Sequence, residues 1–95
     1  IKNLKVIDWL KAELVSSVAA LLRAMVKGSE TLILECITGI IIITYVLGIR
    51  VGIPFSRIDS NVKARLQDSA MKDHEVEKWF GDITSLRHYM EENRR

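Results

Sequence analysis

Apolar positions recur at helical spacing along most of the chain, and this pattern predicts four helices and no strand. The longest apolar run, residues 30–52, reads ETLILECITGIIIITYVLGIRVG and is apolar on nearly every side of a helix. Ser29 is placed to cap the start of this helix, and Gly52 followed by Pro54 is placed to end it. A helix that is apolar all round lies inside a helical assembly or inside a membrane.

The length of the charge-free segment argues against the membrane. Only fourteen residues, Cys36 to Ile49, lie between the charges of Glu35 and Arg50, whereas a helical span needs about 20 apolar residues. A carboxylate near the middle of a span would also need a partner. We therefore expect no membrane contact, and a buried central helix in a soluble bundle.

The other helices are predicted over residues 3–27, about 57–69, and 74–92 with Asp73 as the cap. The first helix has two stripes: a main apolar one of Ile7, Leu14, Val18, Leu21 and Met25, and a second of Val6, Trp9, Glu13, Ser16, Ser17, Ala20 and Ala24. The short link at residues 27–28 makes the first two helices antiparallel neighbours. The sequence thus predicts an all-α, four-helix bundle-like fold, with residues 1–95 as a single domain.

Composition narrows the class of protein. The net charge is only +2, with basic residues interleaved among acidic ones, so we expect neither DNA nor RNA as a partner. One cysteine makes no internal disulfide, and no Cys/His cluster suits zinc. Without a secretion signal pattern, the expected location is cytoplasmic. A 95-residue chain has too little surface to cover every side of the 30–52 helix, so we expect a homo-oligomer, a dimer or a tetramer.

Two acids stand out. Glu13 is the only charge on the second stripe of the first helix, and Glu35 is the only acid well inside the apolar run. If these faces pack together, the two carboxylates come within reach of one metal ion. The alternative is that Glu35 lies near the edge of its helix and reaches water or an arginine.

Three segments carry a family resemblance: IKNLKVIDWLKAELVSSVAALLRAMVKGSE, YVLGIRVGIPFSRID and HEVEKWFGD. They resemble the MazG-like family, a branch of the all-α nucleoside triphosphate pyrophosphatase superfamily. Active members of that superfamily carry Glu-x-x-Glu on the first helix and Glu-x-x-Asp on the second. Residues three apart share one helical face, so the four carboxylates hold Mg²⁺ against the triphosphate and help activate water.

The resemblance places these motifs on Glu13-Leu14-Val15-Ser16 and Glu35-Cys36-Ile37-Thr38. Each motif keeps its leading glutamate, while Ser16 and Thr38 replace the second acids. It implies a nucleoside triphosphate pyrophosphohydrolase-like protein with a degenerate Mg²⁺ site, Glu13 and Glu35 being the metal ligands and Ser16 and Thr38 secondary contacts. Lys63 is then a candidate phosphate contact, or otherwise a surface residue. The alternative is a catalytically inactive, oligomeric helical module that binds a nucleotide or a protein partner.

Overall fold

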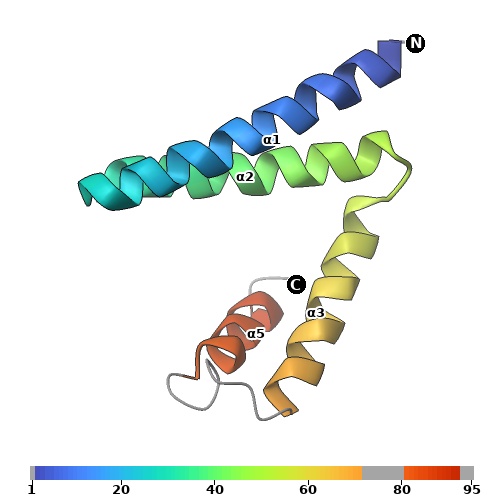
Figure 1. Ribbon diagram of the computed structural model, residues 1–95. Coiled ribbons are helices and arrows are strands. Elements are labelled where there is room, and N and C mark those ends of the chain that lie inside the picture. The colour runs from blue at the N-terminus through green and yellow to red at the C-terminus, as the bar shows by residue number, and fades with distance from the viewer. Residues whose placement is uncertain (1, 72–80, 93–95) are drawn as a thin grey trace. The chain divides into compact units, whose positions relative to one another are not determined.

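The computed structural model describes residues 2–71 and 81–92 (Figure 1). These ranges contain four helices and no strand: α1 (Lys2–Lys27), α2 (Glu30–Arg50), α3 (Phe55–Met71) and α5 (Asp82–Glu92). The all-α prediction is confirmed, and α1 and α2 begin and end within two residues of the predicted bounds. Helix α3 begins two residues earlier than predicted. Asp73 and the first part of the predicted 74–92 helix lie outside the described residues.

The chain divides into two compact units, Ile1–Phe55 and Ser56–Arg95. The first holds α1 and α2. The second holds α3 and α5, with Leu66 and Asp59 buried in α3. The expectation of one domain over residues 1–95 stays a prediction.

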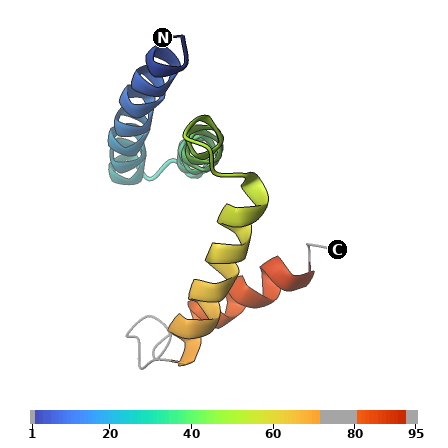
Figure 2. The ribbon, with the colours of Figure 1, turned by 90° about the vertical axis from the view of Figure 1, so that its right-hand side faces the viewer.

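Helices α1 and α2 form an antiparallel hairpin (Figure 1), and the second view also shows them side by side (Figure 2). Gly28 ends α1 at φ +71°, a conformation that costs glycine little. The amides of Ser29 and Gly28 donate to the carbonyls of Ala24 and Met25, at 3.3 Å and 3.2 Å, which is the Schellman arrangement. Ser29 then caps α2, since its Oγ accepts from the amide of Leu32 at 3.4 Å. The predicted cap is confirmed.

The C-terminal end of α2 is capped in the same way. Gly52 has φ +94°, and the amide of Ile53 donates to the carbonyl of Gly48 at 2.9 Å. Asn3 Nδ2 donates to the carbonyl of Arg50 at 3.2 Å, which ties the start of α1 to the end of α2. At the closed end of the hairpin, Leu32 and Cys36 of α2 lie beside Ala20, Arg23, Ala24 and Lys27 of α1, because all six line one pocket.

The core of the hairpin lies along the line where the two stripes of α1 meet. Leu10 and Ala24 are each only 4% exposed, and α2 faces them with the half-buried residues Ile33, Cys36, Ile40, Ile43 and Leu47. No residue of α2 is fully buried. Within the single chain α1 covers only one side of α2, and burial of the other sides stays a prediction that depends on the expected homo-oligomer.

One side of the hairpin is apolar across both helices, and we call it the apolar face. It consists of Val15, Val18, Leu22 and Met25 of α1 with Leu34, Ile37 and Ile41 of α2, spaced three or four residues apart within each helix. All seven side chains are between 43% and 70% exposed. Exposed apolar side chains gathered on one side are typical, in proteins generally, of surfaces that contact a protein or a membrane.

Within the described residues, α2 is the one helix long and apolar enough to cross a membrane, by length and composition only, with a mean hydropathy of 2.4 over its most apolar window. A helix that a protein partner covers has the same composition. Glu35, the sixth residue of α2, is an exposed acid inside this helix.

Candidate functional site

The opposite side of the hairpin carries a mixed set of charged, polar, small and apolar residues, and we call it the polar side. Its members on α1 are Trp9, Glu13, Ser16, Ala20, Arg23 and Lys27, which recur every three or four residues. Its members on α2 are Leu32, Glu35, Cys36 and Gly39. The pocket described below joins the two sets, since both helices contribute to its lining.

Glu13 and Glu35 both lie on this side, as the metal-site prediction requires. Glu13 is half-buried, three residues after the buried Leu10, while Glu35 is exposed. Glu35 lies between Leu32 and Cys36, which line a pocket with Ala20, Arg23, Ala24 and Lys27 of α1, so along the hairpin Glu35 is level with residues that follow Glu13 by about two turns of α1. Neither carboxylate has a hydrogen-bond or ion-pair partner in the described part of the chain.

The hydroxyl residues are placed less favourably. Ser16 is exposed on the polar side, one turn beyond Glu13. Thr38 lies two residues from both Cys36 and Ile40, which face α1, and residues two apart on a helix do not share a face. Thr38 therefore points away from α1, and this hairpin does not bring all four predicted ligands together.

The number of carboxylates on the hairpin limits the kind of metal site that Glu13 and Glu35 can form. Among the described residues, no group of three or more His, Cys, Asp or Glu side chains is placed to hold a metal ion. Mg²⁺ is commonly held by one or two carboxylates, with water and phosphate oxygens completing its coordination. Glu13 and Glu35 fit that minimal arrangement. A site for several ions, which needs more acids, does not fit.

Lys63 lies on α3, in the second unit, and is half-buried. Its predicted contact with phosphate stays a prediction.

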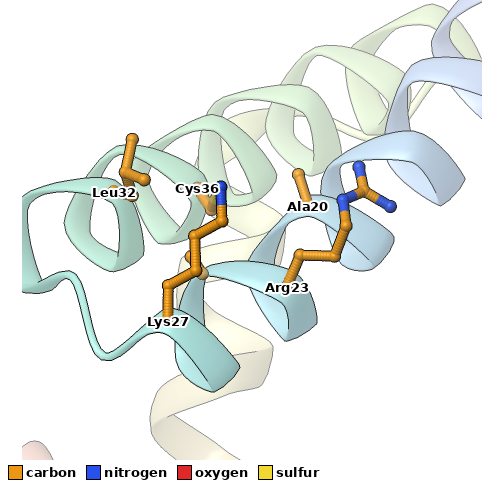
Figure 3. A pocket seen from close by; sticks show the side chains of 6 residues that line it. Ala20, Arg23, Lys27, Leu32 and Cys36 are labelled. Carbon is orange, nitrogen blue, oxygen red and sulfur yellow. The ribbon is translucent and has the colours of Figure 1, made fainter.

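The structure adds two residues that the sequence analysis did not select. Arg23 and Lys27 line a pocket between the end of α1 and the start of α2 (Figure 3). Considered by itself, Arg23 is predicted from the sequence to face solvent. The sequence shows only the α1 part of this pocket, which is two cations four residues apart beside Ala20 and Ala24.

A family model for the MazG-like family matches residues 1–83. No curated protein matches the chain significantly, and no solved structure does so either. The chain belongs to the MazG-like family, as the three quoted segments predicted, and its fold is of the nucleoside triphosphate pyrophosphohydrolase-like kind.

Proposed function

We propose that this member of the MazG-like family binds a nucleoside triphosphate through one Mg²⁺ on the polar side of its α1–α2 hairpin. The observation that carries the proposal is the placement of Glu13 and Glu35. They lie on the same side of adjacent helices, and neither has a partner within the described residues. Two unpaired carboxylates repel one another, and a divalent cation with its phosphate ligands relieves that repulsion.

The reaction that fits this site is release of pyrophosphate. A water oxygen bonds to the α-phosphorus, the bond from that phosphorus to the bridging oxygen breaks, and pyrophosphate leaves with the bonding electrons. Bound Mg²⁺ supplies charge neutralisation for the phosphate oxygens. Glu35 is exposed and would accept the proton of the attacking water, while half-buried Glu13 would serve as a metal ligand. Ser16 would donate a hydrogen bond to a phosphate oxygen of the bound nucleotide.

The second candidate is an inactive member that retains binding alone, and the orientation of Thr38 favours it. With Ser16 and Thr38 in place of acids, and Thr38 turned away from α1, the site has two negative charges where the active motifs have four. Fewer ligand charges weaken metal affinity. Binding without turnover is the result that would select this candidate.

Both candidate functions are compatible with the same homodimer. We propose that a second copy covers the apolar face, so that two hairpins form a four-helix bundle. The seven residues that define the face are uncharged, with Glu30 in line with them at the start of α2, and a two-fold axis brings the face against itself. Such a chain stays soluble in the cytoplasm without detergent. A protein that needs detergent, or that partitions into phospholipid vesicles through α2, contradicts this part of the proposal.

Turnover is tested by a pyrophosphate-release screen over the common ribo- and deoxyribonucleoside triphosphates with Mg²⁺. We expect release by the wild type and its loss in Glu13→Gln and Glu35→Gln. Glu30→Gln is the matched control, since Glu30 is an exposed acid in the first turn of α2, in line with Leu34 and Ile37 of the apolar face. Equal activity in all four proteins would remove the assigned roles of Glu13 and Glu35.

A further inference from the structure

The pocket on the polar side lies at the closed end of the hairpin, beyond Glu13 and next to Glu35, which stands between Leu32 and Cys36 in α2. It measures about 170 Å³ and is lined by Ala20, Arg23, Ala24, Lys27, Leu32 and Cys36. The uncharged residues form its floor, where Ala24 is buried and Cys36 half-buried. Figure 3 shows the side chains of Arg23 and Lys27 rising on the same side of the helices, flanking Ala20 and Cys36.

The charges of this pocket are uncompensated. No acid lines it, and within the described residues neither Arg23 nor Lys27 has an ion pair or hydrogen bond. Like charges four residues apart on a helix destabilise each other, and an anion held between them reverses the sign of that interaction. Lys11 differs, because it pairs with Asp8 at 3.2 Å.

The start of α2 adds to the same field. The N-terminal end of a helix carries a partial positive charge, and Leu32, in the first turn of α2, lines the pocket. Glu30, the acid of that turn, lies in line with Leu34 and Ile37 on the apolar face instead. The pocket thus combines two side-chain cations with a helix N-terminus, a combination that attracts phosphate.

We infer that this pocket binds a phosphate group, with Arg23 and Lys27 contacting its oxygens. The inference rests on the proposed function for the source of that group, which is the triphosphate tail of the nucleotide or the released pyrophosphate. Position supports the link, because Arg23 follows Ser16 by seven residues on the same side of α1, about 10 Å along the axis. A polyphosphate that starts near Glu13 would run along this side of α1 toward the pocket, which Glu35 adjoins.

Cys36 supplies the readout, because it lines the pocket and is the only cysteine in the chain. The rate of its alkylation by uncharged iodoacetamide is measured against pyrophosphate concentration, in EDTA and at constant ionic strength. We expect saturable protection of Cys36. In Arg23→Gln/Lys27→Gln, pyrophosphate should bind about tenfold or more weakly, because each substitution removes a charge-assisted contact.

The matched control is Lys5→Gln/Lys11→Gln, which removes the same charge from α1 outside the pocket. It should retain wild-type protection. Absence of protection in the wild type, or equal loss in both double variants, overturns the inference. So does a change of oligomeric state in Arg23→Gln/Lys27→Gln with protection unaltered, because the two cations would then belong to a subunit interface.

A second arm separates this inference from the proposed function. Glu13→Gln/Glu35→Gln should keep protection by pyrophosphate in EDTA, while it loses protection by a non-hydrolysable triphosphate with Mg²⁺. Wild-type protection by pyrophosphate but not by the triphosphate identifies free pyrophosphate as the source and supports the pocket while refuting the nucleotide site. If neither pyrophosphate nor the triphosphate protects Cys36 in the wild type, the pocket is refuted, whatever the glutamate variants show.

Discussion

The apolar face makes the sharpest quantitative prediction. Ile41 is 52% exposed in the single chain, and full burial of an isoleucine contributes about 1.5–3 kcal/mol. Covering the remaining half therefore contributes about 1 kcal/mol in each copy. A two-fold dimer contains this residue twice, so Ile41→Ala should weaken dimerisation by about 2 kcal/mol, or about 30-fold in the dissociation constant.

Sedimentation velocity over a dilution series measures that constant directly. The matched control is Ile40→Ala, one residue away, because Ile40 is half-buried toward α1. Its main effect should be a lower free energy of unfolding, with a smaller change in dimer affinity. A specific dimer is expected to have a dissociation constant of about 1 μM or lower. A wild type that is still monomeric at about 100 times that concentration would refute the reasoning, and so would an Ile41→Ala dimer as tight as the wild type.

Three further predictions concern the hairpin and its ligands. Leu10→Ala should lower the free energy of unfolding by about 3 kcal/mol, because Leu10 is 4% exposed between the helices; urea denaturation followed by circular dichroism measures it. Gly28→Ala should cost about 1 kcal/mol through backbone strain alone, since φ is +71° and no other atom lies within 4 Å of an added Cβ. Gly39→Ala, with helical φ and equally open space, should instead stabilise by about 1 kcal/mol, and thermal melts with the same sign for both would contradict this contrast. Ser16→Glu should tighten Mg²⁺ binding in calorimetry, whereas Thr38→Asp should change it little, because Thr38 points away from α1.

Local signals in the sequence predicted the hairpin well. Ser29 and Gly52 define the ends of α2 through interactions with neighbouring residues, so a short stretch of sequence contains the whole cause. The family assignment had the same basis in three short segments and is confirmed over residues 1–83.

Burial was harder to predict, because it depends on what lies opposite each helix. The two stripes of α1 were identified, but α2 packs along their boundary, where Leu10 belongs to neither. The apolar character of α2 predicted burial, yet periodicity cannot say whether the covering surface belongs to the same chain. Glu35 and Thr38 lie three residues apart in α2, as the motif requires, but both are exposed and neither is among the half-buried residues that face α1.

The pocket was not predicted for a related reason. Arg23 and Lys27 read as solvent-facing residues at the end of a helix, and only the antiparallel register brings Leu32 and Cys36 beside them. The charged residues of α1 do not indicate which residues of α2 lie opposite them and complete the pocket.

The measurement that tests the central claim most directly is a calorimetric titration of the protein with a non-hydrolysable nucleoside triphosphate in the presence of Mg²⁺. The wild type is compared with Glu13→Gln/Glu35→Gln, and each is repeated in EDTA. The account predicts binding by the wild type that requires Mg²⁺ and disappears in the double variant. Binding of equal strength in both proteins, or none in the wild type, would contradict a metal-dependent nucleotide site at Glu13 and Glu35.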